Sequence, residues 1–236
     1  RTRNVAHRLI EEAMLAANVC SADFIAQSKH PGLFRVHEGP TPEKKETLRN
    51  YLKATGIGMN ISDNPKPAEF QAIAEATKER PDALQIHSML LRSMQQAIYT
   101  PFNSGHFGLA FEAYTHFTSP IRRYPDLLVH RLLQQYLLSP KPSTSESEIE
   151  MIAKHSSNME QKAAEAERAS TKYTLALMME QHIGKVMEAT ITGITEWGIY
   201  AMATEYHCEG LIRITDIKTD RFAYFEAEKK LVGQRT

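Results

Sequence analysis

The chain has 236 residues, of which 42% are hydrophobic and 24% charged, a composition typical of soluble globular proteins. No stretch approaches the ~20 consecutive apolar residues that cross a bilayer, so we expect no membrane association. The 28 basic residues balance 28 acidic ones, which disfavours a broad basic surface and leaves room only for a local nucleic-acid site.

Length and cysteine usage limit the organisation further. A chain of 236 residues exceeds a typical single domain, so we expect one large and one small domain. Cys20 and Cys208 lie far apart and no signal peptide precedes them, which favours a reducing, cytoplasmic setting. Two thiols also argue against a zinc site.

The residues from 4 to 99 are predicted to be mostly helical. Asn4 can cap a first helix that runs to about Ser28, with apolar residues at helical spacing. A connector follows, in which a short apolar run lies between a Pro-Gly and a Gly-Pro pair. Three further helices are delimited by proline, glycine and capping residues, over residues 41–56, 68–79 and 82–99.

The segment HFGLAFEAYTHFTSPIRRYPDLLVHR, residues 106–131, combines aromatic residues with two prolines five positions apart. The alternating aromatics near its start suit a half-buried strand. A helix that began at Ser119 would place Pro125 in its second turn, where proline removes a hydrogen bond and clashes with the preceding turn. We therefore expect the helix to begin at Pro125.

Residues 118–123 then form an elbow that leads into a helix N-terminus. Arg122 and Arg123 stand side by side there, next to amide groups that have no partner within the helix. Guanidinium groups and free amides together suit a phosphate group. The alternative is that both arginines are solvated and the aromatics belong only to the core.

The last part of the chain changes character twice. The proline- and serine-rich residues 139–145 indicate a surface loop, and residues 146–182 then predict one long helix that ends before Gly184. From Lys185 onward the pattern is one of short alternating segments, which predicts strands over residues 186–192, 198–203 and 209–214.

Two of these stretches resemble a known family. AYTHFTSPIRRYPDLLVHR, residues 113–131, resembles the signature of the ribonuclease II/ribonuclease R family, and within it ribonuclease R; GKVMEATITGITEWGIYAMA and EGLIRITDI resemble the opening strands of an S-one type OB fold. The resemblance implies an α+β protein. Residues 1–183 would be the C-terminal part of an RNB catalytic domain, and residues 184–236 an incomplete five-stranded OB-fold β-barrel. More of the catalytic domain would lie upstream of Arg1, and the final strands after Thr236.

The activity implied by the resemblance is processive, hydrolytic 3′-to-5′ degradation of RNA to nucleoside 5′-monophosphates. The implied partner is the 3′ end of single-stranded RNA, and the implied cofactor is Mg²⁺, whose aspartate ligands are not in this chain. We expect the whole protein to be a cytoplasmic monomer, and residues 1–236 alone to be inactive.

The resemblance also assigns site residues. Arg122 would neutralise charge on the scissile phosphate, and Glu11, or Glu12 if the register differs by one, would accept hydrogen bonds from ribose hydroxyls. His7 and Glu11 are four residues apart, but an ordinary pair on one helix face is commoner than a metal site. The remaining expected RNA contacts are Tyr114, His116, Ser119, Arg123, Tyr124, Glu167, Trp197, Tyr200 and Arg213, the last where a histidine is common in the family.

Two other functions compete with the exoribonuclease. One is an RNA-binding adaptor with a degenerate RNB domain, which the scattered aspartates would also fit. The other is dimerisation through the long helix, which lacks a sustained apolar heptad and is therefore ranked last.

Overall fold

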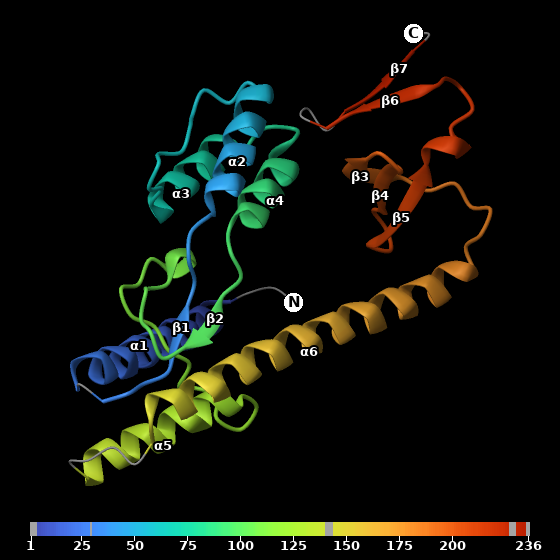
Figure 1. Cartoon of the computed structure of the whole chain (residues 1–236). Coiled ribbons are helices and arrows are strands. Elements are labelled where there is room, and N and C mark those ends of the chain that lie inside the picture. The colour runs from blue at the N-terminus through green and yellow to red at the C-terminus, as the bar shows by residue number, and fades with distance from the viewer. Residues whose placement is uncertain (1–3, 29, 140–143, 227–229, 235–236) are drawn as a thin grey trace. The chain divides into compact units, whose positions relative to one another are not determined.

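The computed structural model describes residues 4–28, 30–139, 144–226 and 230–234 (Figure 1). Within these ranges the chain folds as an α+β protein with six α-helices and small antiparallel sheets, which confirms the expected class. It forms two compact units: residues 1–41, 65–68 and 94–164 give the first, and residues 42–64, 69–93 and 165–236 the second. The domain boundary expected after residue 183 stays a prediction. Among the described helices, none is both long and apolar enough to cross a membrane.

The first unit packs three helices around a two-stranded sheet. Its elements are α1 (Val5–Gln27), β1 (Phe34–Val36), β2 (Ile98–Thr100), the 3₁₀ helix η1 (Phe107–Leu109), α5 (Tyr124–Leu138) and the first half of α6 (Glu146–Glu180). Buried residues of every layer form one core, among them Ile25 of α1, Val36 of β1, Leu132 of α5 and Ile149 of α6. This core anchors α5 against α1 and α6, and so fixes the place where α5 begins.

Helix α1 is buried only through its second half. Val5 and Leu9 recur at helical spacing but are 80% and 69% exposed, whereas Ala22 and Ile25 are almost fully buried. Asn4 caps the helix as expected, accepting a hydrogen bond from the His7 amide. The first half of α1 therefore presents side chains to the surface of this unit.

Helix α5 begins at Tyr124, one residue before the expected start. Arg123 is its N-cap, with an extended backbone (φ −129°), and Pro125 lies in the first turn, where a missing amide hydrogen costs nothing. A helix starting at Ser119 is therefore excluded. The proline spacing was sufficient to locate this helix because proline is incompatible with the interior of a helix.

The aromatic segment after Gly105 is not the strand that its alternation predicted. Phe107–Leu109 form a 3₁₀ turn, and Ala110 follows in the left-handed conformation (φ 57°). His106 both pairs with Phe111 and caps the turn, so the chain folds back on itself before a ladder can extend. The aromatic rings pack locally instead, with Phe111 stacked on Tyr114.

The connector and the fourth helix were also predicted wrongly. Residues 34–36 form strand β1, which pairs antiparallel with β2. Because β2 takes up Tyr99, the helix that was expected to run to residue 99 ends at Ser93. Periodicity alone cannot detect such short strands, whose pairing depends on a partner about 64 residues away, as for Arg35 and Tyr99.

The second unit contains a helical cluster and a small β structure. The cluster consists of α2 (Pro42–Ala54), most of α3 (Pro67–Ala76) and α4 (Ala83–Ser93). Leu48, Leu52, Phe70, Ile73 and Ile86 are buried in it. On its surface Arg49 bonds Asp63 and Glu46, and the Asp63 partnership holds the pKa of Arg49 above its ordinary value.

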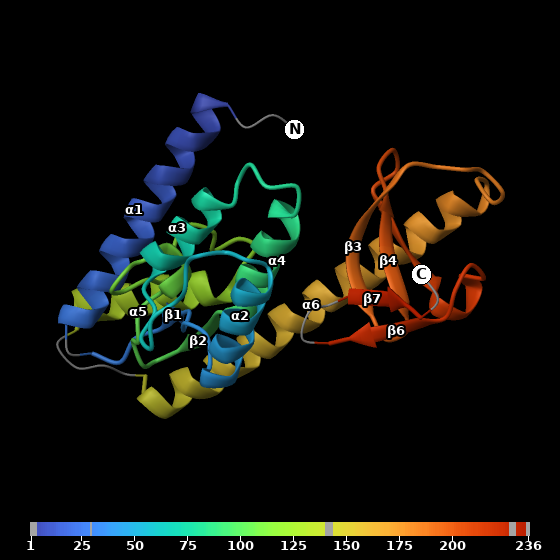
Figure 2. The same cartoon turned by 90° about the horizontal axis from the view of Figure 1, so that it is seen from above.

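The β structure has more strands than the three expected. β3 (Ala189–Thr195), β4 (Gly198–Ala203) and β5 (Cys208–Arg213) form one antiparallel sheet, and β6 (Phe222–Phe225) pairs with β7 (Lys230–Gly233) in another. The 3₁₀ turn η2 (Ile214–Asp216) leads from β5 toward β6. Figure 2 shows the β6–β7 hairpin running across the direction of β3 and β4, and β7 contacts β3. A bulge between Ile191 and Gly193 bends β3, as barrels require.

Gly198 is the position in this sheet that most requires glycine. Its φ is +154°, and a Cβ would come within 2.1 Å of the Ile212 carbonyl oxygen. We expect Gly198→Ala to lower the free energy of unfolding by about 1–3 kcal/mol, because backbone on the neighbouring strand must move. Gly210→Ala on β5, where a Cβ meets nothing within 4 Å, is the matched control. Urea unfolding measures both, and equal losses would contradict the steric argument.

Candidate functional site

The elbow, residues 118–123, is closed by hydrogen bonds at both ends. The Ser119 carbonyl accepts from the amides of Arg122 (3.3 Å) and Arg123 (3.0 Å). Oδ2 of Asp126 accepts from the Ser119 amide (2.7 Å) and from Nη2 of Arg123 (2.8 Å). One carboxylate in the first turn of α5 therefore holds both the entry and the exit of the elbow.

The two arginines of the elbow have different environments. The Arg123 side chain is 22% exposed and forms an ion pair with Asp126, which is fully buried. Arg122 is exposed and forms no ion pair with the described residues, and its neighbour Ile121 projects fully into solvent. Arg123 thus holds the backbone, while the Arg122 guanidinium is available to a ligand.

A buried polar contact supports the segment just before the elbow. Asn18 of α1 donates from Nδ2 to the Tyr114 hydroxyl (2.9 Å), and its Oδ1 accepts from the Phe117 amide (3.0 Å). Asn18 and Tyr114 are 3% and 6% exposed. The carbonyl of Tyr114 also accepts from the Arg35 amide of β1. Residues 114–117 are therefore fixed to both α1 and β1.

Tyr99 and His116 form a second polar contact beside the elbow. The Tyr99 hydroxyl and Nδ1 of His116 are 2.8 Å apart. Burial raises the pKa of Tyr99 to about 12; burial, and then the positive charges of Arg123 and Arg35, lower the pKa of His116 to about 3. At neutral pH the tyrosine therefore donates and the neutral histidine accepts. Arg35 lies over the Tyr99 ring and pairs with Glu160 of α6 at 2.6 Å.

Two cavities in the first unit meet at Arg123. The first, here called the α1 pocket, has a volume of about 410 Å³ and brings Glu11 together with Tyr114 and Arg123. The second, the α6 pocket, has a volume of about 880 Å³ and is lined by Arg122, Arg123 and Tyr124, with Tyr99 and His155. Their linings collect five of the predicted site residues. His116 and Ser119 are joined to the same region through Tyr99 and Asp126.

Three polar atoms of this region are buried without a hydrogen-bond partner in the described part of the chain. They are Oγ1 of Thr118, Nε of Arg123 and Oδ1 of Asp126. Such atoms are rare in folded proteins and each needs a physical explanation. All three atoms lie in or beside one elbow, so the elbow contains hydrogen-bonding groups that no described residue uses.

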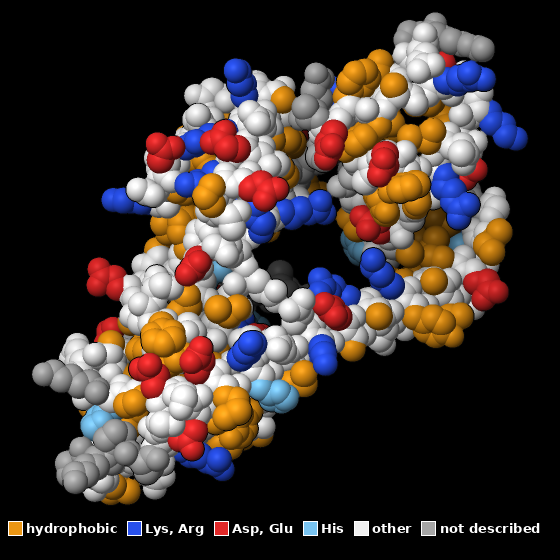
Figure 3. Space-filling model, in the orientation of Figure 1, with side chains coloured by type: hydrophobic (Ala, Val, Ile, Leu, Met, Phe, Trp, Pro, Cys, Tyr) orange, Lys and Arg blue, Asp and Glu red, His pale blue; other side chains and the backbone are white. Residues whose placement is uncertain are grey.

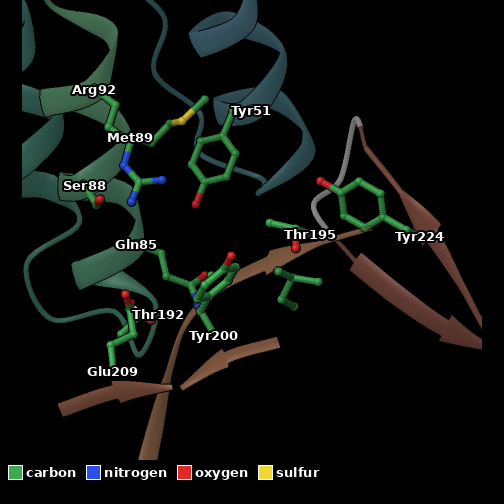
Figure 4. Close-up of a pocket in the computed structure, with 12 residues that line it drawn as sticks. Tyr51, Gln85, Ser88, Met89, Arg92, Thr192, Thr195, Tyr200, Glu209 and Tyr224 are labelled. Atoms are coloured by element: carbon green, nitrogen blue, oxygen red, sulfur yellow. Dashed lines mark hydrogen bonds between the residues drawn. The ribbon is translucent and has the colours of Figure 1, made fainter. Parts of the chain in front are cut away.

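The remaining predicted site residues belong to the second unit. Glu167 lies on an exposed face of α6, and Trp197 is 69% exposed in the turn between β3 and β4. Gly198 pairs with Arg213, and the Trp197 carbonyl accepts from the Ile214 amide, so Trp197 and Arg213 lie at the same end of the sheet. Tyr200 lines a separate cavity between α2, α4 and the sheet, with Tyr51, Arg92 and Tyr224 (Figure 4).

Charge on the molecule is mixed rather than continuous. On the face shown in Figure 3, Lys and Arg side chains are interspersed with Asp and Glu. The described residues contain no group of three or more His, Cys, Asp and Glu side chains placed to hold a metal ion. Mg²⁺ needs several converging oxygen ligands, so these residues do not fit it as a resident ion.

Sequence reasoning missed three residues of the site. Asp126 was not among the predicted site residues, although a carboxylate three residues after an arginine at a helix start can pair with it. Asn18 and Tyr99 carry no local signal, because their partners lie 96 and 17 residues away. Such contacts arise only from the tertiary fold.

Two partly buried histidines predict a pH dependence of stability. His116 and His106 have pKa values lowered by burial to about 3 and about 4, whereas an unfolded histidine titrates near pH 6.5. Between these values the unfolded chain binds more protons, so stability is fully present above pH ~6.5 and is lost as the pH falls. We expect His116→Gln to reduce the loss of the free energy of unfolding between pH 7.5 and pH 5, measured by urea unfolding. The exposed His155→Gln is the control, and an equal slope in both variants would refute this.

Comparison with known proteins places this site in a family. Residues 1–139 match the family model described as the RNB domain. Ribonuclease R of Escherichia coli is 36% identical over 98% of this chain, and that of Thermotoga maritima is 40% identical over 100%; the chain covers 30% and 34% of their lengths. The structure of Mycoplasma genitalium RNase R in complex with ribose-methylated single-stranded RNA superposes with a TM-score of 0.91 at 31% identity, covering 100% of this chain and 38% of that one.

This chain therefore spans about a third of the length of the curated relatives that it matches. The family model, however, covers more than half of the chain, including α1, the elbow and α5. The chain belongs to the RNB domain family.

Proposed function

We propose that this chain is part of a processive, hydrolytic 3′-to-5′ exoribonuclease that degrades single-stranded RNA to nucleoside 5′-monophosphates. The single observation that carries the proposal is the elbow, where an exposed Arg122 lies beside the ion pair of Arg123 with the buried Asp126. Family membership and similarity to ribonuclease R support it. Because the chain covers about a third of those relatives, the activity is proposed for the whole protein that contains it.

Arg122 is assigned to the scissile phosphate. Its guanidinium can donate two parallel hydrogen bonds to phosphate oxygens, which an ammonium group cannot do. Charge accumulates on those oxygens in the transition state, so a donor held in place beforehand lowers the barrier. Arg123 lines both pockets and stays an expected RNA contact, while its Nη2 is held by Asp126.

The α1 pocket is assigned to the terminal nucleotide. Glu11 can accept hydrogen bonds from ribose hydroxyls, and the Tyr114 ring lines the same cavity. His116 and Tyr124 lie on the side of the α6 pocket and would contact the adjoining part of the RNA. Ser119 contributes its amide to the elbow, and its hydroxyl stays an expected RNA contact.

The β structure of the second unit is assigned to RNA capture. Trp197 and Tyr200 offer aromatic faces for base stacking, and Arg213, at the same end of the sheet as Trp197, can neutralise a phosphate. Glu167 on α6 is a secondary contact. We further propose a cytoplasmic, monomeric protein; Cys20 and Cys208 are both free thiols, which suits a reducing compartment.

A divalent metal bound elsewhere in the whole protein would supply an activated water to such a reaction. The described residues do not collect the ligands for that metal, so they are assigned only binding and positioning. Arg122 and Glu11 act on the phosphate and the ribose, and neither needs to exchange a proton.

The first test concerns Arg122. In the whole protein, Arg122→Lys should lower single-turnover cleavage by at least about a hundredfold with little loss of RNA affinity, on the scale of one lost transition-state donor. Arg131→Lys is the control, because Arg131 is exposed on α5, the helix that follows the elbow, and lines neither the α1 nor the α6 pocket. An unchanged rate would remove the assignment, and binding without shortening of RNA in the unaltered protein would favour the adaptor function.

The second test concerns the aromatic residues of the second unit. Trp197→Ala with Tyr200→Ala should weaken binding of long single-stranded RNA by up to a few kcal/mol, because stacking contributes about 1–3 kcal/mol per base. Hydrolysis of very short oligomers should be spared. Phe225→Ala, a half-exposed aromatic on β6, is the control. Equal losses on short and long substrates would contradict a role in capture.

A further inference from the structure

Asp126 is the most completely buried charged group of the site. It is 0% exposed, while the other partner of its ion pair retains some exposure. A buried carboxylate is costly unless it is paired and hydrogen-bonded. Its position in the first turn of α5 favours the negative charge, and Nη2 of Arg123 and the Ser119 amide provide its two hydrogen bonds.

Those two bonds determine where Arg122 lies. Asp126 forms hydrogen bonds to Ser119 and to Arg123, near the two ends of the elbow. Ile121 and Arg122 form the tip between them. Among the described residues, the only hydrogen bond that holds the exposed tip is the one from the Arg122 amide to the Ser119 carbonyl. If Asp126 released Ser119 and Arg123, the direction of the Arg122 side chain would no longer be fixed.

The pair is also not arranged for stability alone. An arginine and a carboxylate can form two parallel hydrogen bonds, yet here Nε of Arg123 and Oδ1 of Asp126 are both buried and without a partner in the described part of the chain. Oδ2 instead accepts two bonds, one of them from the backbone. Asp126 therefore makes one hydrogen bond to Arg123 instead of two, and its other hydrogen bond is to the Ser119 amide. Buried pairs of this kind are often replaceable by apolar residues without loss of folding, which makes a purely structural role a poor explanation.

We propose that Asp126 is a positioning residue for RNA cleavage: acting through Ser119 and Arg123, its charge holds the elbow so that Arg122 meets the scissile phosphate. This rests on the function proposed above for Arg122. A misplacement of about 1 Å at a reacting centre can cost two orders of magnitude in rate, so a group without contact to the substrate can control turnover.

The test is a double-variant cycle in the whole protein, read as single-turnover rate and as RNA affinity. Asp126→Asn keeps the shape and removes the charge; we expect a rate about 10- to 100-fold lower with RNA affinity nearly unchanged. Combined with Arg122→Lys, it should be no slower than Arg122→Lys alone, because both changes remove the same contact. If the double variant instead lost rate by the product of the two single-variant losses, the proposal would be overturned. Asp63→Asn is the control, since Asp63 also pairs with an arginine but is 94% exposed.

A second variant covers the case in which Asp126→Asn does not fold. Arg123→Met with Asp126→Leu replaces the pair by apolar side chains, a change that folded proteins often tolerate. We expect a folded, RNA-binding protein with slow cleavage, and full activity would overturn the proposal. Failure of the proposed function has a different signature, because then Arg122→Lys itself would leave the rate unchanged.

Discussion

The arrangement of the site depends on one buried charge. Taking the Asp126 carboxylate out of water is unfavourable, and the structure compensates with a guanidinium, a backbone amide and the N-terminal end of α5. Each compensating group belongs to a different part of residues 119–126, so satisfying the charge also fixes the path of the chain. Because this path is fixed, the position of the neighbouring Arg122 is fixed as well. Arg122 takes no part in the ion pair, so its charge is free to bind a ligand.

The surrounding core makes this local arrangement rigid. Leu128, Val129 and Leu132 bury one side of α5 against α1 and α6, so the helix cannot shift to relieve the buried carboxylate. On the other side of the elbow, Asn18 ties residues 114–117 to α1. Tyr99, His116 and Arg35 add a polar layer in which the histidine stays neutral and accepts from the tyrosine. Functional residues held by rigid elements need little reorganisation when a substrate binds.

Much of this could be predicted from the sequence, for identifiable reasons. Prolines 120 and 125 restrict the backbone so strongly that the start of α5 was located within one residue, and Asn4 and the alanine- and glutamate-rich composition of α6 defined two further helices. The predictions were wrong where structure depends on distant partners: strands β1 and β2 exist only as a pair, and the turn after Gly105 overrides the alternation of its aromatic residues. Asp126 was missed for another reason: its partners lie only 3 and 7 residues away, but nothing in the sequence indicates that this carboxylate will be fully buried.

The central claim is that Arg122 acts on the phosphate while Arg123 and Asp126 hold the elbow. The measurement that tests it most directly is chemical rescue: the whole protein carrying Arg122→Ala, and separately Arg123→Ala, is assayed for RNA cleavage with increasing ethylguanidinium. A free guanidinium can replace a side chain that only donates to the phosphate, but not one that organises a backbone. We expect concentration-dependent recovery for Arg122→Ala and none for Arg123→Ala. Recovery of Arg123→Ala, with no recovery of Arg122→Ala, would contradict the account.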